Sequence, residues 1–284
     1  MSERLAVRKT YKLFIGGAFP RSESGRSYAV TDAKGRFVAN ASQASRKDAR
    51  DAVTAARKAF PGWSGRTAYN RGQILYRVAE MLEGRRDQFA DEVRRAGASK
   101  SGAAAEVDAA IDRWVWYAGW ADKLAAVAGA SNPVSGPFFN FSTPEPSGVV
   151  AVIAPDSPLL GLVSVVAPVI VSGNTCVVVA SEPAPLPSVT LAEVLATSDL
   201  PGGVVNVLTG RRDEIAPWLA SHMDVNGVDL AGADSGDVPD LEGKAAENLK
   251  RVLRPGNGAW TDDPGTARMT AFLETKTVWH PVGL

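Results

Sequence analysis

Cysteine and histidine are scarce in this chain of 284 residues, which has one cysteine and two histidines. A single thiol, Cys176, excludes an internal disulfide and any metal site built from several cysteines. His222 and His280 stand far apart in the sequence, so a zinc site is not expected. An excess of charge of one sign is also absent, because 31 basic residues balance 31 acidic ones. Nothing in the charge therefore predicts binding to nucleic acid.

Long hydrophobic runs are missing as well. The N-terminus, MSERLAVRKTYKLF, has no apolar stretch of signal-peptide length. The most apolar segment, residues 159–171, is too short to span a bilayer and contains Pro168. What is present is typical of a globular protein: 45% of the residues are hydrophobic and 22% are charged. We therefore expect a cytoplasmic protein with a sizeable core and no membrane partner.

The first half of the chain predicts three helices. One covers residues 45–60, with Ser45 as its N-cap and Pro61 and Gly62 as its end. A second is expected over residues 67–95, and a third begins near Ser101. The aromatic residues at 114, 116, 117 and 120 lie on this third helix, and we interpret them as core packing in preference to a stacking site for a ligand.

From Pro137 onward the pattern changes to short apolar strands that alternate with helices. Strands are expected at residues 138–143, 148–154, 175–180, 204–208 and 225–230, and helices at 158–172, 187–196 and 211–221. This alternation predicts an α/β fold, with N-terminal helices followed by a doubly wound parallel sheet of the Rossmann type. Residues 232–243 and 255–265 resemble loops, and an amphipathic strand lies within residues 271–282.

Six segments, in this order and spacing, resemble the aldehyde dehydrogenase family. They are KLFIGGAF (12–19), AARKAFPGWS (55–64), YAGWADKL (117–124), EPSGVVAVIAP (145–155), LPGGVVNVLTG (200–210) and FLETKTVW (272–279). The resemblance implies an NAD-binding-type domain over residues 1–243, within which residues 137–147 begin a small antiparallel oligomerisation sheet. Residues 244–284 would hold a remnant segment and the C-terminal oligomerisation strand. The family's catalytic domain would be missing between them.

The resemblance also implies which catalytic groups are missing. The family oxidises aldehydes with a nucleophilic thiolate, a general-base glutamate and an oxyanion-hole asparagine that follows a Pro-Trp pair. Cys176 heads the apolar run CVVVA, so we interpret it as a small buried hydrophobe. The segment Pro155-Asp156-Ser157-Pro158 has a carboxylate where the family has its donor amide. We therefore predict no catalytic residue and no metal site.

The cofactor site implied by the family is also altered. The family's ribose-binding Lys-Pro-Ser-Glu segment corresponds here to residues 179–182, where Val179 replaces the lysine and Glu182 remains. Its diphosphate-binding Gly-Ser-Thr turn corresponds to the turn that begins at Gly232 and contains Asp234, whose charge would repel a diphosphate. Glu182 and Gly232 are vestigial candidates, and NAD binding is predicted to be weak at most.

These points favour a non-catalytic subunit that assembles with a full-length aldehyde dehydrogenase. The contact would use Pro137–Pro144 and Phe272–Pro281, since strand addition is a common way for an unpaired edge to bind. Two alternatives stay open: a residual NAD(H)-binding module, and an aldehyde oxidoreductase that is active only as part of a complex. In all three cases the chain alone is expected to be inactive.

Overall fold

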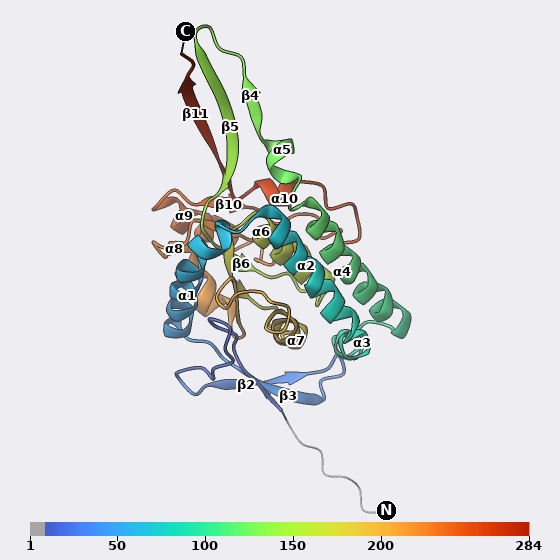
Figure 1. Cartoon of the computed structure of the whole chain (residues 1–284). Helices are drawn as coiled ribbons and strands as arrows, with labels where there is room; N and C mark the ends of the chain where they lie inside the picture. The colour runs from blue at the N-terminus through green and yellow to red at the C-terminus, as the bar shows by residue number, and fades with distance from the viewer. Residues whose placement is uncertain (1–8, 284) are drawn as a thin grey trace, which may run out of the picture.

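A parallel five-stranded sheet forms the centre of the molecule in a computed structural model that describes residues 9–283 (Figure 1). Its strand order is β10–β9–β6–β7–β8. The strands are β6 (Val149–Ile153), β7 (Thr175–Val179), β8 (Val205–Leu208), β9 (Gly227–Asp229) and β10 (Arg251–Leu253). Every residue of β6, β7, β8 and β9 is buried. Their sequences therefore lack the alternation of apolar and polar residues that is typical of a half-exposed strand.

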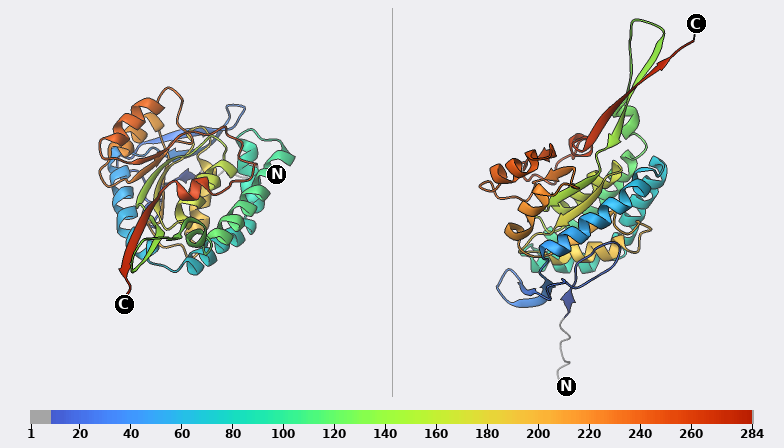
Figure 2. Two further views of the ribbon diagram at one scale, coloured as in Figure 1. Left: turned by 90° about the horizontal axis from the view of Figure 1, so that it is seen from above. Right: turned by 90° about the vertical axis from the view of Figure 1, so that its left-hand side faces the viewer.

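Helices cover both faces of the sheet (Figure 2). On one face lie α1 (Arg46–Ser64), α8 (Arg212–Ser221) and α9 (Val238–Ala246); on the other lie α2 (Ala68–Glu83), α3 (Arg86–Arg95), α4 (Lys100–Trp120), α6 (Leu160–Val171) and α7 (Leu186–Leu195). Successive residues of β6 point alternately into the two resulting cores: Val149 belongs to the core that contains residues of α1 and α8, whereas Val150 belongs to the core that contains residues of α4 and α6. The doubly wound α/β prediction is confirmed.

Two predicted helix boundaries were wrong. Helix α1 does not end at Pro61 but continues to Ser64, because the proline lies in the last turn and its carbonyl accepts the Gly65 N–H at 3.1 Å. The helix expected over residues 67–95 is two helices, α2 and α3, separated at Gly84 and Arg85. The Gly84 N–H bonds to Glu80 O and the Arg85 N–H to Leu82 O, so the helix tightens and stops there.

Several elements were not predicted. A three-stranded sheet near the N-terminus consists of β1 (Thr10–Tyr11), β3 (Phe37–Ser42) and β2 (Ser27–Thr31), and it lies at the end of the body opposite the C-terminus (Figure 1). Within the segment expected to be a loop, α9 forms because Leu241 and Ala245 are buried in the sheet core. The boundary expected at residue 243 falls inside this helix, and β10 then joins the central sheet.

A second antiparallel sheet projects from the body, and we call it the arm (Figures 1 and 2). It consists of β11 (Leu273–Pro281), β5 (Phe138–Pro146) and β4 (Ala130–Asn132), in that order, with the short helix α5 (Leu124–Ala128) at its base. Strands β11 and β5 pair along nine residues, from Leu273 opposite Pro146 to Pro281 opposite Phe138. The small antiparallel sheet expected from the sequence is therefore present.

The chain reaches the arm through residues 254–272, which are fastened to the body. The Arg113 guanidinium on α4 donates to the carbonyls of Trp260 and Asp262 at 2.8 and 3.0 Å. Arg268, on the short helix α10 (Ala267–Thr270), forms an ion pair with the buried Asp229. The ring of Phe272 then enters the core, so the free part of the arm starts after it. Among residues 9–283, no helix is long and apolar enough to cross a membrane.

Candidate functional site

The order of the central sheet reverses between β6 and β9. From β6 the chain proceeds through α6, β7 and α7 to β8, and then returns through α8 to β9 on the other side of β6. In open α/β sheets, ligands bind in the crevice outside the carboxyl ends of the two strands at which the order reverses. The crevice beyond β6 and β9 is therefore the candidate site, and it is bounded by Ala154 and Gly232.

Gly232 brings the two strand ends into direct contact. Its N–H donates to Ile153 O at 2.8 Å, and a Cβ at this position would lie 2.0 Å from the Ala154 carbonyl oxygen. Only glycine allows this approach. Close packing therefore explains why a glycine stands at position 232, one of the two cofactor-site candidates named from the sequence. The role of Gly232 seen here is close packing of two turns.

Arg212, the first residue of α8, extends its side chain into the crevice. Its Nη1 donates to Gly232 O at 3.0 Å, and its Nη2 donates to Ala154 O at 3.2 Å and forms an ion pair with Asp156. Asp156 in turn accepts a hydrogen bond from the Ser181 hydroxyl at 2.8 Å. One guanidinium thus connects the turns that follow β6 and β9, and the Asp156 carboxylate is neutralised by an internal cation.

Glu182 lies beside the same arginine. Its carboxylate accepts from the Arg212 backbone N–H at 3.4 Å and forms an ion pair with Arg211 at 3.5 Å. Burial, and after it the charge of Glu182, raises the pKa of Tyr28, so the Tyr28 hydroxyl stays protonated at neutral pH. The structure therefore brings Glu182 and Gly232 to one crevice, with Arg212 between them. Whether either residue contributes to nucleotide binding stays a prediction.

The cavity in front of the crevice is predominantly acidic. It has a volume of about 530 Å³, and its charged side chains are those of Asp156, Glu182, Asp213, Asp234, Asp237, Arg211 and Arg212. Five carboxylates thus stand against two guanidinium groups. Asp234, which the sequence placed at the expected diphosphate turn, is exposed and faces this cavity.

Cys176 lies inside the sheet and away from the cavity. It is fully buried on β7, where its backbone N–H donates to Val204 O at 2.8 Å and its carbonyl accepts from Asn206. Burial raises the pKa of the thiol far above its usual range, so no thiolate is available near neutral pH. Among residues 9–283 no group of three or more His, Cys, Asp or Glu side chains could hold a metal ion.

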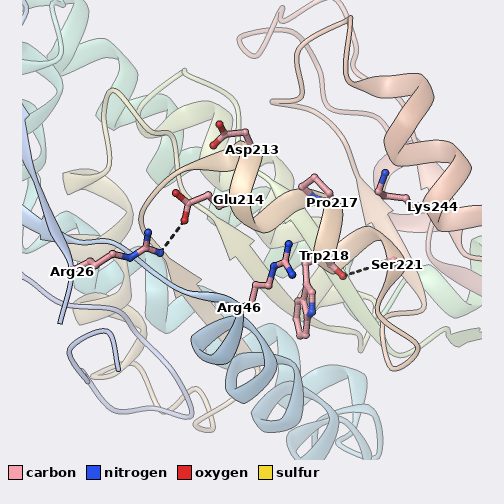
Figure 3. A pocket seen from close by; sticks show the side chains of 8 residues that line it. All are labelled: Arg26, Arg46, Asp213, Glu214, Pro217, Trp218, Ser221 and Lys244. Carbon is pink, nitrogen blue, oxygen red and sulfur yellow. Dashed lines mark hydrogen bonds and ion pairs between the residues drawn. The ribbon is translucent and has the colours of Figure 1, made fainter. Parts of the chain in front are cut away.

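A second pocket, of about 650 Å³, lies beside α8 on the outer surface (Figure 3). Its walls come from α1, α8, α9 and the N-terminal segment, and include Arg26, Arg46, Trp218 and Lys244. Arg26 is paired with Glu214 at 2.9 Å. Neither this pocket nor the position of the Arg212 side chain could be predicted from the sequence. Both are formed by segments that are far apart in the chain, and no sequence motif marks those segments.

The fold and the crevice define an open, doubly wound α/β domain of the kind that binds nucleotides at the switch point of its sheet. Residues 19–255 match the family model described as "Aldehyde dehydrogenase family", and the chain belongs to this family. It is 32% identical over 248 residues to "Aldehyde dehydrogenase, cytosolic 1" of Elephantulus edwardii, which covers 85% of this chain and 49% of that protein. It is 33% identical over 251 residues to human "Retinal dehydrogenase 2", covering 86% of this chain and 48% of that protein.

Solved structures agree with this assignment. The NAD+ complex of an aldehyde dehydrogenase from Bacillus cereus superposes with a TM-score of 0.81 at 26% identity, covering 86% of this chain and 50% of that one. The chain thus spans about half the length of the curated relatives and solved structures that it matches.

Proposed function

We propose that this chain is a non-catalytic member of the aldehyde dehydrogenase family that binds a full-length aldehyde dehydrogenase through its arm. The observation that carries the proposal is a contrast in burial: the body buries its one thiol, whereas the arm exposes large apolar side chains. The only thiol is buried in β7, while Phe138, Phe139 and Trp279 of the arm are exposed to solvent. The exposed side chains of the arm are therefore available to bind a partner. The body has no accessible thiol that could act as the family's nucleophile.

Both faces of the arm are apolar near its tip. Residues paired across β5 and β11 share a face, and the faces alternate along each strand. Phe138 and Trp279 lie on one face with ring centroids 5.8 Å apart, and Phe139 and Phe141 lie on the other at 5.4 Å. Trp279 is 60% exposed and Phe139 51%. Exposed aromatic residues at the tip of a projecting sheet are typical of a protein interface.

The outer edge of β11 supports strand addition as the mode of binding. Within residues 9–283, β11 pairs with β5 on one side and with no strand on the other. A long unpaired edge next to apolar side chains favours pairing with another chain. The occupant we propose is a sheet edge in the catalytic domain of a full-length aldehyde dehydrogenase, because the family resemblance assigns the arm's two segments to that contact.

Co-expression with a full-length aldehyde dehydrogenase of the same organism tests the proposal. Size-exclusion chromatography with light scattering should show a mixed complex at micromolar concentration. The double variant F138S/W279S should elute apart from the partner. The matched control is Met223→Ser, which removes an apolar side chain that is 73% exposed on the body, and this variant should still bind. Separate elution of the wild-type chain would contradict the proposal.

Deletion of the whole C-terminal segment would not be a clean test. Phe272 is buried, and its carbonyl accepts from the Ser147 N–H at 3.1 Å and from Asn174 Nδ2 at 2.9 Å. A deletion that starts at Phe272 would therefore damage the body as well as the arm. Point substitutions beyond Leu273 change the arm and leave these contacts intact.

One observation favours a second function, a residual NAD(H)-binding module. A solved relative that superposes on this chain is described as an NAD+ complex. Titration of the isolated chain with NADH, followed by its fluorescence, separates this function from the first. We expect no saturable binding in the micromolar range and no NADH production from aldehydes by the chain alone.

A further inference from the structure

The crevice at the switch point of the sheet contains a side chain of the protein itself. We infer that Arg212, held by Asp156, occupies the space in which this class of fold receives a dinucleotide and thereby excludes NAD. This inference gives a structural reason for the weak NAD binding expected under the proposed function, and it is independent of whether the arm binds a partner.

The position of Arg212 is determined by contacts on both sides of the switch point. Its guanidinium bonds to carbonyl oxygens at the ends of β6 and β9, at Ala154 and Gly232, and to the carboxylate of Asp156. Only 17% of the Arg212 side chain is exposed. A ligand that entered between the two strand ends would have to displace this side chain and break all three contacts.

Three backbone donors of the turn after β9 are also engaged. A diphosphate bound at the start of a helix requires free N–H groups there. In this turn the N–H of Gly232 donates to Ile153 O, that of Ala233 to Leu230 O, and that of Asp237 to Asp234 O, at 2.8 to 2.9 Å. These three N–H groups already have acceptors within the protein, so they are not available to a phosphate.

Charge acts in the same direction. The cavity before the crevice has five carboxylates, and the less exposed of its two cations, Arg212, is already paired with one of them. A diphosphate brought to this cavity would meet a net negative field, and Arg212 would have to give up Asp156 to compensate. The residues present therefore do not fit the family's cofactor.

Titration of the whole chain with NAD+ and NADH by calorimetry tests the inference. The wild-type protein should show no saturable binding up to about millimolar ligand. The charge-balanced variant R212A/D156N empties the crevice, and binding should become at least about tenfold tighter than in the wild type. The matched control R86A/D108N removes an exposed ion pair of 2.6 Å between α3 and α4, outside the cavity, and should behave as the wild type.

Every outcome decides the inference. Micromolar binding by the wild type, or weaker binding after loss of Arg212, would show that Arg212 receives the ligand, and would overturn it. Equal binding by the wild type and R212A/D156N would overturn it as well. If the double variant does not fold, as judged by circular dichroism, Arg212→Gln provides the same comparison with the crevice only partly emptied. Association with the full-length partner, measured on the same proteins, should be unchanged, so a failure of the proposed function is seen separately.

Discussion

The body and the arm of this protein differ in how far they bury their apolar side chains. All twelve residues of α6 are buried, and β6 and β7 are buried on both faces. On the arm, β11 has one buried residue, Leu273, at the point where it leaves the body. The body therefore stabilises itself, whereas the apolar surface of the arm contributes little to the folded chain. A feature that adds little stability and risks aggregation is best explained by what it binds.

The largest expected effect contrasts two tryptophans. Trp63 is fully buried and its Nε1 donates to Ile170 O at 2.9 Å, so Trp63→Ala should lower the free energy of unfolding by about 3–5 kcal/mol. Trp279→Ala on the arm should change it by less than about 0.5 kcal/mol in the isolated chain. Urea unfolding followed by circular dichroism measures both. Similar losses in the two variants would mean that the arm is part of the stabilising core.

Ion pairs provide the next contrast. Arg268→Ala leaves the carboxylate of Asp229 buried without its counter-charge, which should cost about 3 kcal/mol at pH 8. Lys276→Ala breaks an exposed pair on the arm, with Glu145 at 3.0 Å, and should cost less than about 1 kcal/mol. The double variant R268A/D229N should recover part of the loss. An undiminished loss in that variant would show that Asp229 is not the unpaired charge.

The body should also respond to pH through Glu92. Burial raises the pKa of this carboxyl to about 7, against the opposing hydrogen bond from the Thr190 hydroxyl at 2.7 Å. The folded chain then holds a proton that the unfolded chain releases, so the stability conferred is full below about pH 4.5 and is lost as the pH rises to about 7. The loss should be on the order of 1–3 kcal/mol.

Glu92→Gln isolates this effect from that of Asp229, whose carboxyl pKa is raised by burial to about 6. Thermal unfolding between pH 6 and pH 8 should show a falling melting temperature in the wild type and a flatter curve in the variant. Parallel curves would exclude Glu92 as the titrating group.

Among the substitutions inside the body, the smallest effect on stability is expected at Cys176. Cys176→Ala removes one buried sulfur and should cost about 1 kcal/mol without changing any activity measurement. In the folded wild type the thiol should not react with Ellman's reagent, and it should react when urea unfolds the chain. A cysteine introduced on the arm by Thr277→Cys, in a C176A background, should react in the folded state. Rapid reaction of native Cys176 would contradict its burial.

Periodicity and turn residues predicted most of the body, because short apolar strands alternate there with capped helices. The prediction failed where tertiary packing determined the outcome. Helix α9 lies in a segment rich in Asp and Gly, and it forms because α8 and the sheet bury Leu241 and Ala245. Strand β10 has three residues and no pattern of its own, and it is fixed by pairing with β9.

The candidate site was predicted in part. The family resemblance identified Glu182, Gly232 and the unfavourable Asp156 and Asp234, and the structure gathers all four around one cavity and crevice. The resemblance did not identify Arg212, whose side chain joins residues from the ends of β6 and β9. The place of that side chain depends on the strand order, which the sequence pattern does not specify.

Hydrogen–deuterium exchange of the chain with and without a full-length aldehyde dehydrogenase tests the central claim most directly. In the free chain, amides on the outer edge of β11 should exchange rapidly, while those of β7 should be protected. In the complex, peptides covering residues 273–281 should become protected and those of β7 should not change. Protection confined to the body, or no change in β11 at partner concentrations that saturate binding, would contradict the claim that the arm makes the contact.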